Sequence, residues 1–264
     1  MTGAEMVVKT LEKNGVKVVF GYPGAANCPI IDKLSFSSIK HILTRNEQGA
    51  AHMASGYARV TKQAGVCTAT SGPGATNLIT GIATAYMDSI PMVALTGQVA
   101  TKLIGKDAFQ EVDITGATLP FTKHSYLIKD GLDIPRVVNE AFHIANTGRP
   151  GPVLIDFPMD LLKKEFDYPD EDEDVNIRGY KLMGKANESQ VKKVAEAIKG
   201  AKKPVILAGG GVVISDATNE FRKFVKETDI PVVSTMMGIG ILPSDNPRYY
   251  GMIGSHGVKR ANLL

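Results

Sequence analysis

Apolar and polar positions follow two different patterns along the chain. Short runs rich in branched or apolar side chains, with Gly, Pro or Asn nearby, are typical of buried strands. Such runs lie at Lys17–Phe20, Ile39–Thr44, Val66–Ser71, Met92–Thr96 and Val153–Phe157. Between them, the spacing predicts helices at Ala4–Lys13, Glu47–Thr61, Thr76–Met87 and Ile134–Ala145. Strands that alternate with helices predict an α/β fold, a mostly parallel sheet flanked by helices.

This alternation stops after Lys163 and resumes near Glu188. The intervening segment contains Pro169 and the acidic run Glu171–Asp174, which predict a solvated linker. A second series follows: a helix at Glu188–Lys199, a strand at Pro204–Leu207, a glycine turn, a helix at Ala217–Glu227 and a strand at Pro231–Ser234. We therefore expect one domain over residues 1–163, a linker over 164–187, and part of a second, Rossmann-like α/β domain over 188–264.

Composition narrows the classes of function. The chain has 264 residues, of which 44% are hydrophobic and 22% charged, as in ordinary globular domains. Its 30 basic and 27 acidic residues leave a formal net charge of +3, and no basic cluster is interleaved with aromatics, so nucleic-acid binding is unsupported. No apolar run approaches the roughly 20 residues that cross a bilayer, and no signal-like stretch is present, so we expect a cytoplasmic protein without membrane contact. Cys28 and Cys67 lack metal-ligand spacing, so we expect two small buried side chains and no metal ligands.

Ligands of parallel sheets bind at the carboxyl ends of strands, so we expect ligand-binding residues in the strand-to-helix turns. Three turns are rich in glycine or other small residues: Gly21-Tyr22-Pro23-Gly24-Ala25, Arg45-Asn46-Glu47-Gln48-Gly49-Ala50-Ala51 and Ser71-Gly72-Pro73-Gly74-Ala75-Thr76-Asn77. The third exposes backbone N–H groups at a helix start, a geometry that favours anions and cofactors. It is neither a Walker loop nor the GxGxxG pattern of dinucleotide-binding folds.

The second turn carries an acidic residue, Glu47, at the expected start of a helix. From spacing alone, a carboxylate in the first helical turn is simply favoured by the helix dipole. The small residues beside it also allow the carboxyl group to be sequestered from water. A sequestered carboxyl group has a raised pKa and can share a proton with a bound heterocycle. The pattern leaves both interpretations open.

Taken in order, these turns resemble the N-terminal domain of thiamine-diphosphate-dependent enzymes. Further strings look like the large catalytic subunit of acetolactate synthase (acetohydroxyacid synthase): Gly97-Gln98-Val99, Asp107-Ala108-Phe109-Gln110-Glu111, Thr122-Lys123-His124 and Gly148-Arg149-Pro150-Gly151-Pro152-Val153. The resemblance runs from about Gly3 to the last residue. It implies a transferase of valine, leucine and isoleucine biosynthesis. Such an enzyme condenses two pyruvates, or pyruvate and 2-oxobutanoate, to a 2-acetohydroxy acid with loss of CO2. Another thiamine-diphosphate-dependent decarboxylase, carboligase or pyruvate oxidase is the alternative.

The resemblance also implies roles for individual residues. Glu47 corresponds to the glutamate that hydrogen-bonds the pyrimidine ring of thiamine diphosphate. Pro23 and Gly24 correspond to the loop near that ring, and Gly72 and Pro73 to the entrance of the site. Phe109, Gln110 and Lys123 correspond to the wall of the active site that a second subunit contributes, so the resemblance implies that they contact substrate or take part in catalysis. In this family FAD does no net redox work in the main reaction. The resemblance implies contacts with FAD for Arg149, Gly209, Gly210, Gly211, Thr235, Met236, Met237, His256 and Gly257.

Other implied features lie outside these strings. The family binds the diphosphate and Mg²⁺ through a C-terminal Gly-Asp-Gly…Asn motif, which this sequence lacks, so the Mg²⁺ ligands are expected in a C-terminal domain. The 264-residue chain alone is expected to be inactive, and a binding or dimerisation fragment is the non-enzymatic alternative. The implied partners are a second copy, in a homodimer or higher oligomer, and a regulatory small subunit.

Overall fold

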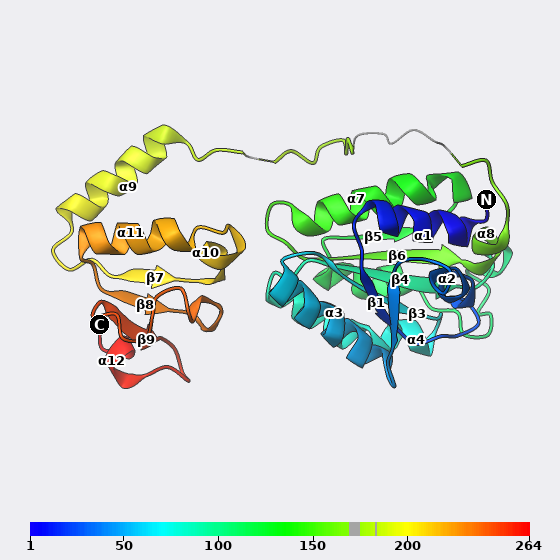
Figure 1. Ribbon diagram of the computed structural model, residues 1–264, viewed down its shortest axis with the longest axis horizontal. Coiled ribbons are helices and arrows are strands. Elements are labelled where there is room, and N and C mark those ends of the chain that lie inside the picture. The colour runs from blue at the N-terminus through cyan, green and yellow to red at the C-terminus, as the bar shows by residue number, and fades with distance from the viewer. Residues whose placement is uncertain (169–174, 183) are drawn as a thin grey trace. The chain divides into compact units, whose positions relative to one another are not determined.

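The structure is a computed structural model that describes residues 1–168, 175–182 and 184–264. The predicted acidic run Glu171–Asp174 lies outside the described residues. Two compact units are present, Met1–Leu182 and Met183–Leu264, and each contains its own sheet (Figure 1).

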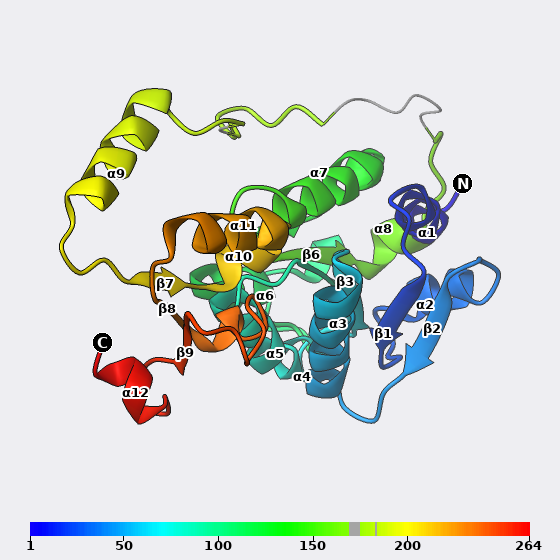
Figure 2. The same ribbon diagram turned by 60° about the vertical axis from the view of Figure 1, so that its left-hand side comes forward.

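The first unit is built on a parallel sheet with the strand order β2-β1-β3-β4-β6-β5. Its strands are β1 (Val18–Gly21), β2 (Lys40–Leu43), β3 (Gly65–Ala69), β4 (Met92–Gln98), β5 (His124–Leu127) and β6 (Pro152–Pro158). Every residue of the central strands β3, β4 and β6 is buried, which explains their continuous apolar sequences. The edge strands β2 and β5 are partly exposed, and Figure 2 shows β2 beside β1 at one margin of the sheet.

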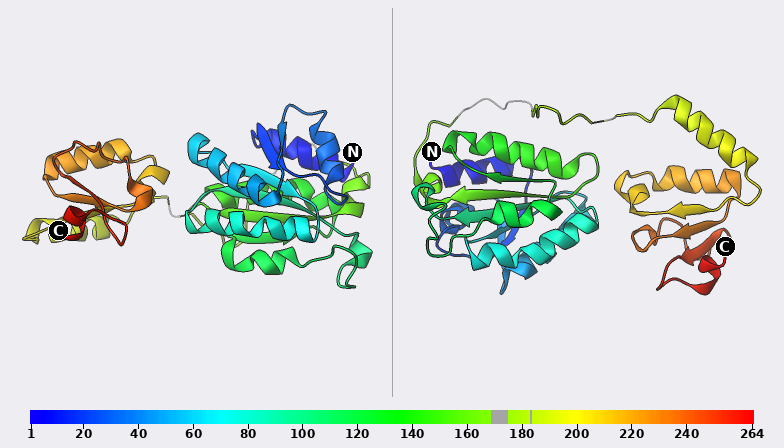
Figure 3. Two further views of the ribbon diagram at one scale, coloured as in Figure 1. Left: turned by 90° about the horizontal axis from the view of Figure 1, so that it is seen from below. Right: turned by 180° about the vertical axis from the view of Figure 1, so that it is seen from behind.

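Helices cover both faces of this sheet (Figures 1 and 3). On one face, α1 (Gly3–Lys13) packs against α7 (Ile134–Asn146), and the core between them and the sheet includes Leu11, Val138 and Phe157. The other face carries α3 (Glu47–Thr61), α5 (Ile79–Met87) and α6 (Ile114–Thr118). The remaining elements of this unit are α2 (Cys28–Leu34), α4 (Pro73–Asn77), α8 (Met159–Lys163) and short 3₁₀ turns at Thr101–Leu103, Leu119–Phe121 and Gly131–Asp133.

Several local expectations need correction. The helix predicted over Thr76–Met87 is divided into α4 and α5, because the Leu78 N–H bonds the Ala75 carbonyl three residues back and tightens the turn. The sequence pattern did not predict α2, α6 or the half-exposed edge strand β5. Cys67 is buried in β3 as predicted, but Cys28 is exposed at the first residue of α2, so the prediction for Cys28 was wrong.

The second unit contains a three-stranded sheet of parallel strands in the order β7-β8-β9. Its strands are β7 (Ile206–Ala208), β8 (Val232–Ser234) and β9 (Tyr249–Met252), and its helices are α9 (Glu188–Gly200), α10 (Gly210–Ile214), α11 (Thr218–Thr228) and α12 (Lys259–Asn262), with a 3₁₀ turn at Met236–Gly238. Val225 of α11 packs on Ala208 and Val232 in a small core. Both units therefore confirm the predicted α/β class.

A carboxyl group is buried in the middle of the larger sheet. Asp156 of β6 accepts hydrogen bonds from Thr96 Oγ1 at 2.6 Å and from Gln98 Nε2 at 2.8 Å, both on the neighbouring strand β4. Burial raises the pKa of Asp156 to about 7, and the negative charge of Asp113 adds to the rise, while the two hydrogen bonds oppose it. Asp156 is therefore a proton-binding group near neutral pH.

Replacing Asp156 by Asn should weaken the pH dependence of stability. The folded protein keeps the Asp156 proton up to about pH 7, whereas the unfolded chain loses it near the ordinary pKa of 3.8. In that window the folded state binds more protons, so this group makes the free energy of unfolding fall as pH rises. Asn does not ionise, and the fall between about pH 5 and about pH 8 should be smaller in Asp156→Asn.

Urea-induced unfolding followed by circular dichroism at the two pH values measures this difference. Asp167→Asn, which removes an exposed carboxyl group, is the control. An unchanged pH dependence in Asp156→Asn would show that Asp156 has the same proton affinity in the folded and unfolded chain.

Candidate active site

The carboxyl edge of the six-stranded sheet gathers most of the predicted site residues of the first unit. The loops that follow β1, β2, β3 and β4 meet there, because all of these strands run in the same direction. These loops and the first residues of the helices that follow them carry Pro23 and Gly24, Glu47, Gly72 and Pro73, and Phe109 and Gln110.

The loop after β1 lies directly against the residue that follows β3. A Cβ added to Gly24 would lie 2.4 Å from Thr70 Cβ, so only glycine fits there. Thr70 Oγ1 in turn accepts the Ala26 N–H at 3.1 Å. Asn27 is fully buried, and its Oδ1 accepts the Gly24 N–H at 2.7 Å while its Nδ2 donates to Thr68 Oγ1 at 3.2 Å. The amide of Asn27 therefore holds the Pro23-Gly24 turn in place.

Glu47 is the first residue of α3. The helix is capped by Asn46, whose side chain accepts the Gln48 N–H at 2.8 Å, and the cap places Glu47 at the positive end of the helix dipole. Asn77, the last residue of α4, donates its Nδ2 to Glu47 Oε2 at 3.0 Å. A Cβ on Gly74 would lie 3.3 Å from Glu47 Oε1. The carboxylate is thus half-buried at the start of two helices, with accepting capacity left for a ligand.

A second close approach lies beside this carboxylate. Gly72 has a φ of 58°, and a Cβ there would lie 2.7 Å from the carbonyl oxygen of Gln110. Gln110 itself has a φ of 58°, an uncommon conformation for a residue other than glycine. The preceding side chain, Phe109, is 88% exposed. The structure therefore brings Gln110 to the same edge of the sheet as Glu47 and leaves the Phe109 ring facing outward.

A buried amide, missed by the sequence analysis as a site residue, connects this loop to the sheet. Gln98, the last residue of β4, donates its Nε2 to Asp156 Oδ2 and also to the Val112 carbonyl at 2.8 Å, and its Oε1 accepts the Val99 N–H at 2.9 Å. The signal was available in part, since Asp156 is a charged residue inside an apolar run. A carboxylate in such a run needs partners on a neighbouring strand.

Lys123 and Arg149 lie at the opposite, amino edge of the sheet, where β5 and β6 begin. The Lys123 ammonium donates to the Ile144 and Thr147 carbonyls at the end of α7. Arg149 donates from Nε to Ser89 Oγ at 2.7 Å, just beyond the end of α5. Within one chain, the structure does not bring either residue together with Glu47.

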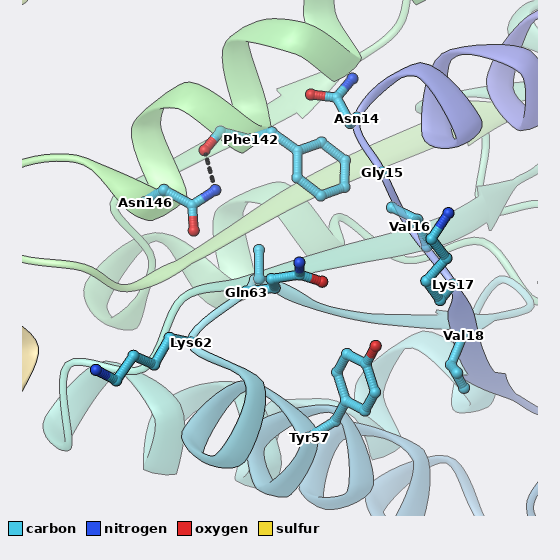
Figure 4. Close-up of a pocket in the computed structure, with 11 residues that line it drawn as sticks. Asn14, Gly15, Val16, Lys17, Val18, Tyr57, Lys62, Gln63, Phe142 and Asn146 are labelled. Atoms are coloured by element: carbon cyan, nitrogen blue, oxygen red, sulfur yellow. Dashed lines mark hydrogen bonds between the residues drawn. The ribbon is translucent and has the colours of Figure 1, made fainter.

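A cavity of about 330 Å³ also lies at the amino edge (Figure 4). It is bounded by the ends of α1, α3 and α7, and Figure 4 shows Tyr57, Gln63, Phe142 and Asn146 around it. None of the predicted site residues lines this cavity. It is therefore separate from the site around Glu47.

The second unit repeats the arrangement of turns at a carboxyl edge. Gly209, Gly210 and Gly211 follow β7, the segment Thr235-Met236-Met237 follows β8, and His256 and Gly257 lie in the turn after β9. A Cβ on Gly210 would lie 2.9 Å from Met237 Cβ, so the first two turns touch. Nothing lies within 4 Å of a Cβ built on Gly211. The predicted cofactor residues of this unit thus occupy one edge of its sheet.

Two kinds of feature are absent from residues 1–168, 175–182 and 184–264. No group of three His, Cys, Asp or Glu side chains is placed to hold a metal ion there. Nor does any helix in this part of the chain combine the length and apolarity that a bilayer span requires.

The first unit thus combines a parallel sheet with a half-buried glutamate between glycine turns, and a second α/β unit follows it in the sequence. The chain belongs to the thiamine pyrophosphate enzymes. Residues 1–117 match the model of the thiamine pyrophosphate enzyme N-terminal TPP binding domain, and residues 191–264 match that of the central domain. The resemblance drawn from the motifs is confirmed at this level.

Individual relatives are similar over almost the whole chain. A probable acetolactate synthase large subunit of Methanocaldococcus jannaschii is 54% identical over 265 residues, which cover 99% of this chain and 45% of that protein. The acetolactate synthase of Mycobacterium bovis is 52% identical, with 99% of this chain and 42% of the relative covered. The acetolactate synthase large subunit of Buchnera aphidicola is 48% identical, with 100% and 46% covered. The chain spans less than half the length of these relatives.

Substituting Gly72 by Ala should destabilise the first unit. The new Cβ would meet the Gln110 backbone, and the positive φ is unfavourable for alanine, so we expect a loss of about 1–3 kcal/mol in the free energy of unfolding. Gly56 is the matched control, because it is exposed inside α3 with nothing within 4 Å of its Cβ position. Gly56→Ala should gain about 0.5–1 kcal/mol through helix propensity.

Urea midpoints of the two variants give the comparison. If Gly72→Ala were as stable as Gly56→Ala, the close packing of the Gly72 and Gln110 backbones would be refuted.

Proposed function

We propose that the chain supplies the pyrimidine-binding part of an acetolactate synthase. The reaction joins two pyruvates, or pyruvate and 2-oxobutanoate, into a 2-acetohydroxy acid with loss of CO2, in the synthesis of branched-chain amino acids including isoleucine and valine. The observation that carries the proposal is the Glu47 carboxylate, half-buried against Gly74 and bound by Asn77 at the sheet edge that also carries the Pro23-Gly24 turn and Gly72. The names of the similar proteins support the choice of reaction.

Glu47 is proposed to accept a hydrogen bond from the pyrimidine ring of thiamine diphosphate. The residues present fit such a ring. One carboxylate oxygen is engaged by Asn77, and the carboxylate keeps accepting capacity for a ring N–H. The glycines at positions 24, 72 and 74 let the surrounding loops pack closely beside it. When bound, the cofactor supplies the carbanion chemistry, and the protein orients it and excludes water. The contribution of Glu47 is to hold or move a proton at a ring nitrogen.

Gln110 and Phe109, like Lys123, are proposed to contact the substrates in the wall that one subunit contributes to the site it shares with its partner. Gln110 is held against Gly72 on the Glu47 side of the sheet, which supports its placement there. Lys123 stays a predicted substrate contact of a second subunit. In its own chain, the Lys123 ammonium binds the carbonyl end of α7, an interaction that supports a stabilising role as well.

The second unit is proposed to bind FAD. The turns after β7, β8 and β9 form a cradle at one sheet edge, and the open space at Gly211 allows a diphosphate to approach the backbone. Arg149, on the first unit, remains a predicted contact of the same flavin. We also propose that Mg²⁺ and the thiamine diphosphate phosphates bind in a part of the enzyme that corresponds to the remaining length of the relatives.

The chain is also proposed to associate with a second copy of itself and with a regulatory small subunit. The proposed location is the cytoplasm. The partly exposed Glu47 and the 88% exposed Phe109 support an association that covers this edge. Burial of an exposed aromatic side chain by a partner is favourable, because it removes apolar surface from water. On this proposal the 264-residue chain alone is inactive.

Product analysis with pyruvate tests the proposed reaction. The complete enzyme, supplied with thiamine diphosphate, Mg²⁺ and FAD, should release CO2 and form acetolactate. The 264-residue chain under the same conditions should form none. Acetaldehyde or peroxide as the product would replace the proposal by a decarboxylase or a pyruvate oxidase, and turnover by the chain alone would refute the need for a further part.

A further inference from the structure

The loop that carries Phe109 and Gln110 is organised around the carboxylate of Glu111. This carboxylate accepts the backbone N–H groups of Gly105, Lys106 at 3.3 Å and Ala108 at 2.9 Å. The hydrogen bonds from these N–H groups lower the pKa of Glu111, so the acceptor is ionised at neutral pH. One side chain thereby fixes the first half of the loop.

The same contacts determine the backbone at Gln110. The loop contains left-handed residues at Gly105, Asp107 and Gln110, with φ values of 77°, 52° and 58°. The Glu111 N–H closes a turn onto the Ala108 carbonyl at 2.9 Å, across Phe109 and Gln110. Unusual backbone angles outside glycine persist only where surrounding contacts hold them. Glu111 provides these contacts from both its side chain and its N–H group.

A second attachment holds the end of the loop. Val112 follows Glu111 directly, and its carbonyl accepts the Gln98 amide that Asp156 also binds. The segment between Gly105 and Val112 is therefore fixed at its start by the Glu111 carboxylate and at its end by a buried amide of the sheet. Gln110 lies between the two attachments, with its backbone on Gly72.

We propose that Glu111 is a positioning residue whose carboxylate holds Gln110 against Gly72 at the edge of the site. It acts through Gln110 and touches no reacting atom. The catalytic consequence rests on the proposed function, since it requires Gln110 to contact substrate, whereas the structural consequence does not.

The test compares Glu111→Gln with Asp107→Asn. Glutamine keeps the size of the side chain but turns one acceptor oxygen into an NH2 group that faces backbone donors. Asp107→Asn removes the same charge from the same loop and keeps a residue type that tolerates a positive φ. Hydrogen–deuterium exchange of the 264-residue chain, read by mass spectrometry on peptides that cover residues 104–112, reports loop order without any cofactor.

Amides of this loop should exchange about tenfold faster in Glu111→Gln, while peptides from β3, β4 and β6 stay at the wild-type rate. Asp107→Asn should exchange like the wild type. Equal exchange in all three proteins would overturn the proposal.

Steady-state kinetics of the complete enzyme give the second readout. Glu111→Gln should lower kcat/KM for pyruvate about tenfold, and Asp107→Asn should leave it unchanged. A loosened loop with unchanged kcat/KM would overturn the catalytic role of the positioning. If the wild-type enzyme forms no acetolactate, the proposed function fails, and the exchange result still decides whether Glu111 orders the loop.

Discussion

The close approach of backbone loops at the carboxyl edge of the larger sheet is the constraint on which the site depends. Gly24 packs on Thr70, and Gly72 packs on Gln110. Gly97 of β4 packs on Ala26, because a Cβ built on Gly97 would lie 2.5 Å from the Ala26 carbonyl carbon. A side chain at any of these glycines would push two loops apart. Gly72 and Gly97 pack on backbone atoms and Gly24 on the Thr70 side chain, so the loops are closely packed along this edge, and Glu47 projects from a helix that begins there.

Polar contacts inside the sheet hold one of these loops in place. Asp156 binds Gln98, and Gln98 binds Val112, so a buried carboxylate two strands from β3 reaches the loop that carries Gln110. A polar network at this depth is stabilising only when every member has partners. Its attachment to the loop that carries Gln110 gives a physical reason for placing a proton-binding carboxyl group in an otherwise apolar strand.

Much of this architecture could be predicted from the sequence. The buried strands are continuous apolar runs, and once they are read as parallel, the glycine turns must meet at one edge, which is where Glu47 and Gly72 lie. Arg149 precedes β6, which the apolar run predicts, so its place at the amino edge follows from the same reasoning. The position of Lys123 could not be predicted in this way, because it precedes β5, a half-exposed strand with a weak sequence signal. The organisation of the Glu111 loop depends on three left-handed residues, of which only Gly105 is a glycine.

Exchange of the thiazolium proton of thiamine diphosphate with deuterium tests the role of Glu47 most directly, because this exchange precedes any step with substrate. In the complete enzyme, Glu47→Gln should slow the exchange by about a hundredfold or more, since a neutral amide does not take up the proton that the carboxylate shares. Glu188 also opens a helix after an asparagine cap but lies in the second unit, so Glu188→Gln should exchange like the wild type. Near-normal exchange in Glu47→Gln would contradict the assignment of Glu47 as the residue that acts on the pyrimidine ring.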